Sequence, residues 1–475
     1  MHTFQLINNT SRGQALKQKQ LKQICWDQSM IEKYNYSGPR YTSYPTALEF
    51  DDSFTEAQLL TSIKNSKSNK LSLYIHIPFC AKLCYYCGCN KIITRHQHKA
   101  DQYIDSLSKE IIKRAPLFKN YNVTQMHWGG GTPTFLTPEQ IIRLAKLLKQ
   151  HFQFAATGEF SIEIDPREIA LSMLDTLKEA GFNRISVGVQ DFNKEVQVAV
   201  NREQSEQFIF DLVAKAKAMG FVSTNLDLIY GLPHQTPESF AKTIKRIIEL
   251  SPDRLSVFNY AHLPARFAAQ RKIKDEHLPT PEQKLLILQQ TIETLTNAGY
   301  QFIGMDHFAK PDDVLAKLQN EGKLHRNFQG YTTQEECDLL GLGVSSISQI
   351  GDCYAQNQKD LRPYYDAIEN QGHALWKGCH LNQDDEIRRA VIKQLICHFE
   401  LSMASIEQKF DIQFEHYFAE DLKLLQTFID DELVHLNNRV LTISETGHLL
   451  IRNICMCFDV YYRQKARQQQ FSRVI

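Results

Sequence analysis

The chain has 475 residues, of which 43% are hydrophobic and 23% are charged, a composition typical of globular proteins with a large core. Lysine plus arginine equals aspartate plus glutamate at 54 each, so no overall charge favours nucleic acid or an anionic membrane as a partner. No run of 18 apolar residues is present, and the start, MHTFQLINNTSRGQ, lacks the apolar core of a signal peptide. We therefore expect a cytoplasmic protein of about two domains, without membrane insertion and without nucleic acid.

The first predicted segment is an N-terminal extension and cap over residues 1–70. Residues 1–29 are polar and rich in glutamine and lysine, which is compatible with a surface helix or a loose extension. Several hydrogen-bond donors follow, and they either close over a ligand or pack on the surface: Tyr34, Tyr36, Arg40, Tyr41 and Tyr44.

The second segment, residues 71–375, alternates β-branched or aromatic runs with stretches of helical period. Such βα repeats predict a parallel sheet, and strands with one apolar and one polar phase suggest that it curls around a polar interior. The predicted helices include residues 101–116 and 138–152. The predicted strands are 72–78, 124–131, 160–166, 184–190, 224–233, 254–260 and 301–307.

Polar residues and glycines follow these strands where each one ends. In barrels of this kind the loops at the carboxyl ends of the strands converge, so function gathers there. The candidates are Gly129, Gly130, Gly131, Asp165, Gln190, Asp227, His262 and His307.

The third segment, residues 376–475, is predicted to be a mainly helical domain that covers the active site. Helices are expected at 384–400, 414–429 and 445–458, around a hairpin at 433–444. A winged-helix module that reads DNA would have similar elements, but the acidic side chains of the middle helices oppose phosphate. The basic tail, 463–475, is either solvated or folded back over the mouth of the barrel.

The most informative stretch is CAKLCYYCGCN, which places Cys80, Cys84, Cys87 and Cys89 in one loop after the first strand. The chain has eleven cysteines, an odd number at irregular spacing, which differs from the paired framework of a small secreted domain. A structural zinc site usually needs a second pair of ligands, and the expected interval contains none. Three thiolates on one short loop suit three irons of a [4Fe-4S] cube, with the fourth iron open to a ligand.

At this point the sequence resembles the radical SAM superfamily, which carries C-x3-C-x2-C after the first strand of a partial (βα)6-type, TIM-like barrel. The resemblance implies that Cys80, Cys84 and Cys87 hold the cluster and that S-adenosyl-L-methionine (SAM) chelates the open iron. Tyr86 matches an aromatic packed beside an adenine, although a loop aromatic that fills the core is equally compatible. The run GGGTP, residues 129–133, resembles the glycine motif that meets the amino group of SAM.

Further segments resemble one family within this superfamily, the oxygen-independent coproporphyrinogen III oxidases. They include KYNYSGPRYTSYPTA, GVQDFNKEVQ, NLDLIYGLP, HRNFQGYTT, DLLGLGVSSIS and RNICMCFD, and the resemblance covers roughly residues 31–475. It implies oxidative decarboxylation of two propionates of coproporphyrinogen III to vinyls, which gives protoporphyrinogen IX for haem synthesis without oxygen. In this family Cys89 is required but is not a cluster ligand.

The resemblance also assigns binding residues for two SAM molecules. Tyr74, Gly130, Glu163 and Ile347 match positions near the cluster-bound SAM. Positions lining the second SAM match Tyr86, Gly131, Thr132, Gln190, Arg202, Asp227 and Ala261. The catalytic candidates are Cys89, His76 and Tyr74.

Structural roles and other functions are alternatives to these assignments. An inward acid pairs with a nearby arginine about as often as it binds a ligand, and a lone histidine on a strand is more often structural. A haem-delivering chaperone of the same superfamily and a radical SAM enzyme for another anionic metabolite are the competing functions, and Cys89 argues against the chaperone. The reductant of the cluster and the final electron acceptor are unidentified, and the resemblance implies a monomer.

Overall fold

The computed structural model describes residues 24–334 and 337–465. The first 23 residues of the predicted N-terminal extension and residues 466–475 of the basic tail lie outside the described residues. Among the helices of the described ranges, none combines the length and the apolar character needed to cross a bilayer.

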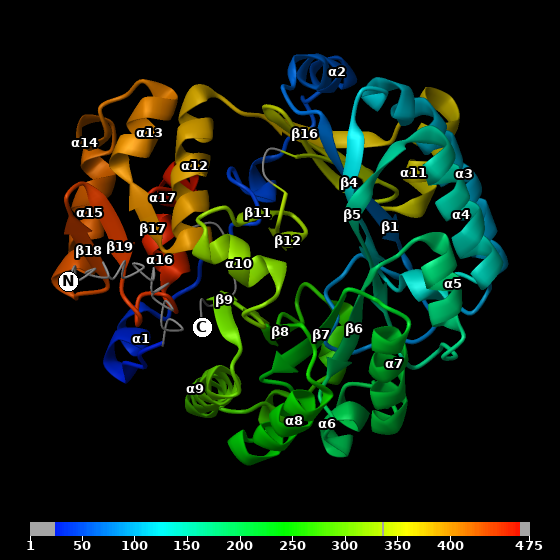
Figure 1. The fold of residues 1–475 in the computed structure, drawn as a ribbon, viewed down its shortest axis with the longest axis horizontal. Coiled ribbons are helices and arrows are strands. Elements are labelled where there is room, and N and C mark those ends of the chain that lie inside the picture. Colours follow the sequence, from blue (N-terminus) through cyan, green and yellow to red (C-terminus); the bar gives the residue numbers. More distant parts are fainter. Residues whose placement is uncertain (1–23, 335–336, 466–475) are drawn as a thin grey trace, which may run out of the picture.

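The core is a twelve-stranded sheet in the order β16-β15-β14-β13-β1-β4-β5-β6-β7-β8-β10-β9. Six neighbouring strands run parallel, each joined to the next through helices on the outer face (Figure 1). These strands are β1 (Lys70–Ile77), β4 (Asn122–Gly130), β5 (Gln153–Ile164), β6 (Arg184–Gln190), β7 (Ser223–Tyr230) and β8 (Arg254–Asn259). The helices that follow them are α3 (His98–Arg114), α4 (Pro138–His151), α5 (Met173–Ala180), α6 (Lys194–Ala199), α7 (Glu206–Ala218), α8 (Pro237–Leu250) and α9 (Pro281–Asn297).

Three of these helices begin with the same tripeptide, Thr-Pro-Glu. In α4, α8 and α9 the N-cap is Thr137, Thr236 or Thr280, and each hydroxyl accepts a hydrogen bond from the amide three residues later. Proline then occupies the first helical position, where no amide hydrogen is needed, and glutamate in the first turn favours the positive end of the helix dipole. The sequence therefore fixes where these helices start.

The two phases of the strands point to different surroundings. On β1 the side chains of Leu71, Leu73, Ile75 and Ile77 are fully buried, and they alternate with polar side chains on the opposite face. Because successive side chains of a strand point to opposite faces, the apolar phase packs under the helices and the polar phase lines the interior. This alternation explains the curled sheet with a polar lumen that the sequence predicts.

Both ends of the sheet depart from the βα repeat, so the barrel is partial. On one side β13 (Asp338–Leu342) pairs in parallel with β1, and an antiparallel meander continues from it. Within the described ranges the two edge strands, β9 and β16, do not pair with each other. The meander strands are β14 (Ile347–Ile350), β15 (Cys353–Asn357) and β16 (Leu375–His380).

The prediction of one strand over residues 301–307 is wrong. Met305 adopts a positive φ of 54°, which breaks the segment into β9 (Gln301–Gly304) and β10 (His307–Ala309), an antiparallel pair. Because β10 pairs with β8 in the antiparallel sense, His307 lies at the start of its strand and not at the end. The repeat thus stops earlier than the sequence suggested.

The C-terminal unit is helical around a small sheet, as predicted, and the hairpin at 433–444 is confirmed. The single helix predicted over 414–429 is wrong, because it is interrupted at Phe418, and the helix predicted over 445–458 is confined to six residues. The elements are α12 (Gln383–His398), α13 (Met403–Phe410), α14 (Phe414–Tyr417), α15 (Ala419–Asp430), α16 (Ile451–Met456), α17 (Val460–Lys465), β17 (Glu400–Ser402), β18 (Val434–Asn437) and β19 (Val440–Ile443).

Smaller elements connect these parts. The N-terminal helix α1 (Gln28–Tyr34) lies below the C-terminal unit in Figure 1. Arg452 of α16 donates to the carbonyls of Gly38 and Pro39, and the Tyr41 hydroxyl donates to Asp459 across 3.0 Å. The remaining elements are α2 (Glu56–Asn65), β2 (Phe79–Cys80), β3 (Ile92–Ile93), α10 (Val314–Asn320), β11 (His325–Asn327), β12 (Gly330–Thr332) and α11 (Leu361–Gln371).

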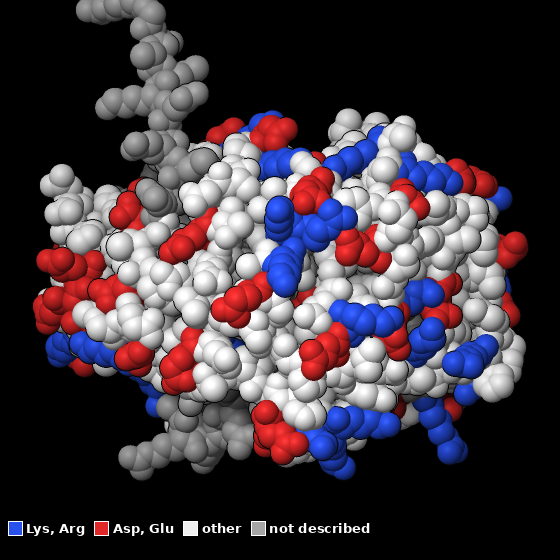
Figure 2. Space-filling view, turned by 90° about the horizontal axis from the view of Figure 1, so that it is seen from below, with Lys and Arg blue, Asp and Glu red and all other residues white. Residues whose placement is uncertain are grey.

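The surface agrees with the balanced charge of the sequence. On the face shown in Figure 2, lysine and arginine side chains are interspersed with aspartate and glutamate. A surface of this kind offers no broad field of one sign to an acidic ligand. Any acidic ligand must therefore be met by cations at a particular site.

Candidate active site

Strand β1 carries Tyr74 and His76 on its inward face, close to the mouth of the barrel. The Tyr74 hydroxyl lies 3.1 Å from Nδ1 of His76, and Nε2 of His76 lies 3.1 Å from the carbonyl oxygen of Asn90. A carbonyl only accepts, so Nε2 carries the proton and Nδ1 accepts from Tyr74. Burial also lowers the pKa of His76, so the ring is neutral and ties β1 to the end of the cysteine loop.

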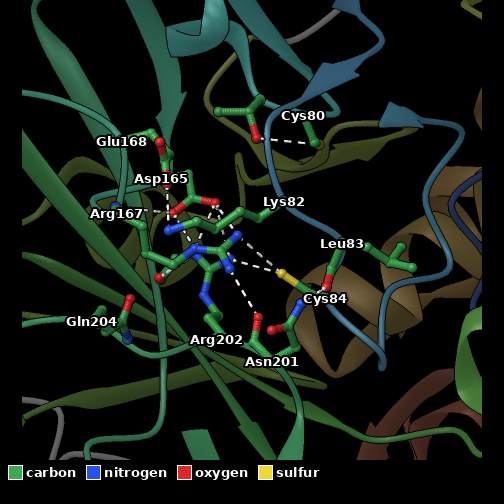
Figure 3. Close-up of polar contacts among 12 residues, drawn as sticks. Cys80, Lys82, Leu83, Cys84, Asp165, Arg167, Glu168, Asn201, Arg202 and Gln204 are labelled. Carbon is green, nitrogen blue, oxygen red and sulfur yellow. Dashed lines mark hydrogen bonds and ion pairs between the residues drawn. The ribbon is translucent and has the colours of Figure 1, made fainter. Parts of the chain in front are cut away.

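The cysteine loop starts at the carboxyl end of β1, and a network of polar residues holds it from one side (Figure 3). The Cys84 sulfur accepts hydrogen bonds from Nη2 of Arg167 at 3.2 Å and from Nη1 of Arg202 at 3.3 Å. Asp165, at the end of β5, pairs with both guanidiniums, at 2.5 Å and 3.3 Å. Burial acts to raise the pKa of Asp165, but the two guanidiniums lower it to about 2, so the carboxylate stays charged.

The loop is further tied to the segment after α6. Nδ2 of Asn201 donates to the carbonyl of Leu83 at 2.7 Å, and the backbone amide of Tyr85 donates to the carbonyl of Val200 at 3.0 Å. On the outer side Lys82 pairs with Glu168 at 2.6 Å. These contacts fix the backbone on which the three cysteines stand.

Polar donors surround Cys80, Cys84 and Cys87, although burial raises the pKa of Cys80 to about 12. Besides the guanidiniums on Cys84, the Thr132 hydroxyl lies 3.3 Å from the Cys80 sulfur, and Lys91 Nζ donates to the carbonyl of Cys87 at 2.9 Å. Within the described ranges, no three His, Cys, Asp or Glu side chains converge closely enough to bind one metal ion. An iron-sulfur cube needs no such convergence, because each thiolate binds a different iron. The three cysteines therefore fit a cube with one iron left open.

Cys89 lies two residues beyond the third cysteine, at the exposed end of the loop. Its thiol forms a hydrogen bond with the Cys87 sulfur, which lowers the pKa of Cys87 to about 6 against the opposing effect of burial. The pKa of Cys89 itself is raised, first by this bond to Cys87, and the charge of Glu163 adds to the shift. Cys89 thus stays a thiol.

The glycine run at the end of β4 lies where no larger residue fits. A Cβ on Gly131 would meet the Pro78 carbonyl carbon and oxygen at 2.7 Å, and one on Gly130 would meet the His76 ring at 2.6 Å. Gly130 also has a φ of 116°, which L side chains rarely adopt. The backbone of β4 therefore approaches both the cysteine loop and β1 closely.

Glu163 of β5 is an acid whose charge acts on several of the other candidate residues. Its Oε2 accepts from the amide of Gly130 at 3.2 Å, and its Oε1 lies 3.2 Å from Nε2 of His127. The Glu163 side chain is 42% exposed although it points inward, so it borders open space. Its charge contributes to the pKa shifts of other candidates, namely Tyr74, His76, Cys89 and Asp227.

Asp227 of β7 lies in a neutral hydrogen-bonding environment. It accepts from the Ser186 hydroxyl at 2.8 Å and from the Asn225 amide at 2.8 Å. Burial raises the pKa of Asp227 to about 6; these hydrogen bonds oppose the shift, and the charge of Glu163 adds to it. A carboxyl with such a pKa is typical of a functional site.

Two predicted residues keep buried polar atoms that lack partners among the described residues. They are Oε1 of Gln190 and Nε of Arg202. Gln190 also has a positive φ of 65°, at a bulge in the pairing of β6 with β7. Buried atoms without partners are rare in folded proteins, so both atoms indicate a polar ligand in this space.

Tyr86 and Ala261 belong to different elements but share one hydrogen-bond donor. Nε2 of Gln270 donates to the carbonyl of Tyr86 at 2.9 Å and to that of Ala261 at 3.2 Å, while its Oε1 accepts from the Leu263 amide at 2.6 Å. Gln270 is 2% exposed. It therefore fixes the distance between the cysteine loop and the loop after β8.

Ile347 lies on the other side of β1, at the start of β14. Tyr74 pairs in register with Gly341 of β13, and a Cβ on Gly341 would meet the Ile347 carbonyl oxygen at 2.6 Å. Gly341 of β13 thus lies between Tyr74 and Ile347. By contrast, Tyr34 packs on Phe428 of the C-terminal unit with ring centroids 4.6 Å apart, away from the cysteine loop.

Sequence reasoning missed Arg167, Gln270, His127 and Asn90 as site residues. Asp165-Pro166-Arg167 at a strand end is a usable signal, because an acid and a base two residues apart at a barrel mouth favour a local pair. Gln270 has no such signal, because its partners are backbone carbonyls of distant segments. His262, predicted near the mouth, lies between Tyr260 and the exposed Asp275.

Comparison with known proteins agrees with this geometry. Residues 74–247 match the radical SAM superfamily, and residues 381–450 match the HemN C-terminal domain. The oxygen-independent coproporphyrinogen III oxidase of Escherichia coli strain K12 is 65% identical over 455 residues, which are 96% of this chain and 100% of that protein. The enzyme of the same name from Pseudomonas aeruginosa is 52% identical over 460 residues, again 96% of this chain and 100% of that protein.

A solved structure is similar over most of the chain as well. It is the E. coli coproporphyrinogen III oxidase, described as a radical SAM enzyme, with a TM-score of 0.90 and 63% identity. The match covers 92% of this chain and 100% of that one. The partial barrel and the helical C-terminal domain expected from the sequence are therefore confirmed, and the chain belongs to the oxygen-independent coproporphyrinogen III oxidase family of radical SAM enzymes.

Proposed function

We propose that this chain converts coproporphyrinogen III into protoporphyrinogen IX, as an enzyme of haem synthesis that needs no oxygen. The observation that carries this proposal is the position of Glu163, which acts electrostatically on Tyr74, His76, Cys89 and Asp227 and thus joins the cysteine loop to the barrel interior. The relatives with this name align over nearly the whole chain.

The residues present suit a [4Fe-4S] cluster and SAM. Cys80, Cys84 and Cys87 would hold three irons, while Tyr86, the glycines of β4 and Glu163 would contact SAM. When bound, the cluster would supply the electron for reductive cleavage of SAM, and together the two cofactors would supply the radical chemistry that converts two propionates into vinyl groups with loss of carbon dioxide.

The chain's own residues position the reactants and control protons. The neutral His76 ring holds the Tyr74 hydroxyl, which is thereby oriented along the inner face of β1. Cys89 remains protonated beside Glu163, so it can supply a proton or a hydrogen atom at the end of the loop. Gln190, Arg202 and Asp227 offer the polar groups for a second SAM, which we propose alongside the first.

Other features of the proposal rest on composition and chemistry. We propose that the protein works as a monomer in the cytoplasm, where thiols stay reduced. A separate reductase must charge the cluster, and a separate acceptor must take the electron that remains after each decarboxylation.

The test is anaerobic reconstitution with iron and sulfide, followed by SAM, a reductant and coproporphyrinogen III. We expect protoporphyrin after oxidation of the products, with two methionines released per substrate. Cys89→Ser should keep the iron content and lose product, while Cys25→Ser, at an exposed position before α1, should behave like the parent protein. Haem capture without turnover would favour the chaperone function, and loss of iron in Cys89→Ser would overturn the ligand assignment.

A further inference from the structure

A second cavity lies outside the site described above. It is a cleft of about 760 Å³ between the open edge of the barrel and helix α12, and its volume is in the range of small-molecule sites. Its walls come from residues 41–44, the start of β13, β11 and α12. None of the residues predicted to bind the cluster or SAM lines it.

Two of the four acidic side chains that line this cleft, Asp338 and Asp352, have several partners. Asp338 accepts from the Ser66 hydroxyl at 2.6 Å, the Tyr121 hydroxyl at 3.0 Å and the Gly351 amide at 3.0 Å. Asp352 accepts from the Ser62 hydroxyl at 2.6 Å and pairs with His380 at 3.0 Å. These carboxylates are therefore poor candidates for binding a cation.

Two arginines of the cleft, Arg326 and Arg389, have donor atoms without hydrogen-bond partners among the described residues. Among the described residues, Nε and Nη1 of Arg326 and Nη1 of Arg389 have no hydrogen-bond partner. Arg326 forms no ion pair in the described ranges, and its guanidinium stacks on the Tyr331 ring, 4.7 Å from the centroid. Arg389 forms an ion pair with Glu386 through Nη2 at 3.7 Å and a hydrogen bond with Tyr354, so its unused donor is Nη1. The groups of the cleft that remain available for hydrogen bonds are thus positively charged donors.

Arg326 also connects the cleft to the barrel interior. The His307 ring packs edge-on against Tyr331, the ring on which Arg326 stacks, with the two ring centroids 5.3 Å apart. His307 pairs in register with Ser256, which lies 3.3 Å from the Asn225 amide, and Asn225 donates to Asp227. The inner wall of the cleft is therefore only a few side chains from the predicted SAM site.

Resting on the proposed function, we propose that this cleft binds the propionate carboxylates of the porphyrinogen that are not converted, through Arg326 and Arg389. The substrate carries four carboxylates and loses two, so two remain that need partners through both turnovers. Arginine is the side chain best suited to this role, because its planar fork binds a carboxylate with two parallel hydrogen bonds. A protein of zero net charge must place such cations at particular positions, and in this cleft Arg326 and Arg389 are the two arginines.

The test measures binding of coproporphyrin III, the stable oxidised tetracarboxylate, to the anaerobically reconstituted enzyme by fluorescence titration. We expect Arg326→Gln and Arg389→Gln each to weaken binding about tenfold or more, the usual effect of losing a charged hydrogen bond. Arg326→Lys should recover part of the affinity, because it keeps the charge and loses the fork. The control is Lys409→Gln, at an exposed position on the rim of the cleft, which should change binding less than twofold.

Two further readouts separate this role from a structural one. With coproporphyrinogen III as substrate, the arginine variants should raise KM with little change in kcat, and SAM binding should remain that of the parent protein. Unchanged porphyrin affinity in the double variant, or an equal loss of SAM and porphyrin binding, would overturn the proposal. If the parent enzyme makes no protoporphyrin but the arginines still govern porphyrin binding, the proposed reaction fails and the carboxylate site stands.

Discussion

The guanidinium of Arg167 donates a hydrogen bond to the Cys84 sulfur across 3.2 Å, although 83 residues separate the two in the sequence. Asp165 holds Arg167 in place through its side chain, so the bond is part of the fold. Hydrogen bonds to the sulfurs of an iron-sulfur cluster stabilise its reduced, more negative state.

Arg167→Gln is therefore expected to lower the reduction potential of the reconstituted cluster. If reduction strengthens the bond by about 1 kcal/mol, the shift is ~40 mV for one electron. A redox titration followed by electron paramagnetic resonance measures it, after iron content is shown to be intact. Lys82→Gln, which removes an ion pair on the outer side of the same loop, should leave the potential unchanged. Equal shifts in both variants would assign the effect to loosening of the loop.

Gln270→Ala is expected to weaken SAM binding without loss of iron. The substitution leaves the carbonyls of Tyr86 and Ala261 without their shared donor, which costs about 1–3 kcal/mol for buried groups. Equilibrium dialysis with labelled SAM gives the affinity and the number of molecules bound. Gln289→Ala, on α9 with an exposed partner in Glu293, is the matched control. Unchanged affinity in Gln270→Ala would contradict its positioning role.

The pKa of about 6 at Asp227 predicts a pH dependence of SAM binding. Below this value the side chain is protonated and loses an acceptor, so affinity should rise between pH 5.5 and pH 7.5. Because burial raises the pKa of Asp227 from 3.8 to about 6, folding stability should fall as the pH rises from about 4 to about 6, and this loss should be absent in Asp227→Asn. The variant should thus show flat binding across this range, while Asp211→Asn, at an exposed position of α7, keeps the slope. A slope that survives in Asp227→Asn would assign it to another group.

Tyr364→Phe is expected to destabilise the barrel by about 2 kcal/mol, because its hydroxyl donates to the buried carboxyl of Glu110 at 2.7 Å. Glu110 also accepts from the Gly343 amide at 2.9 Å, so hydrogen exchange at Gly343 should accelerate as the carboxyl loses a donor. The control is Tyr365→Phe, whose hydroxyl has no hydrogen bond within the described parts of the chain. The expected order is a lower thermal midpoint for Tyr364→Phe than for Tyr365→Phe, and the reverse order would refute the argument.

The sequence predicts the six βα units well, because the period of apolar residues and the repeated Thr-Pro-Glu caps are local signals. It predicts the ends of the sheet poorly. The break at Met305 depends on pairing between β10 and β8, and the interruption at Phe418 depends on packing in the C-terminal unit. Gly304 precedes the first break, but a single glycine in a strand pattern does not by itself predict a new antiparallel pair, and neither proline nor glycine lies near Phe418.

The candidate site shows the same division. The cysteine spacing and the strand-end glycines are visible in one dimension, so their positions in the sequence were sufficient to identify them. Gln270 and Arg326 could not be predicted from the sequence, because their contacts are with carbonyls and rings of other segments. The roles assigned to the SAM-binding residues stay predictions, although the structure brings them to one mouth.

The pairing of β1 with β13 has a consequence for biosynthesis. β1 ends at Ile77, but β13, which covers one of its edges, begins only at Asp338. At the usual pace of translation, roughly 5–20 residues per second, the ribosome needs tens of seconds to make the missing neighbour. During that interval the cysteine loop has emerged on a strand whose β13 edge is still unpaired, so the complete barrel cannot yet shield its thiols from solvent.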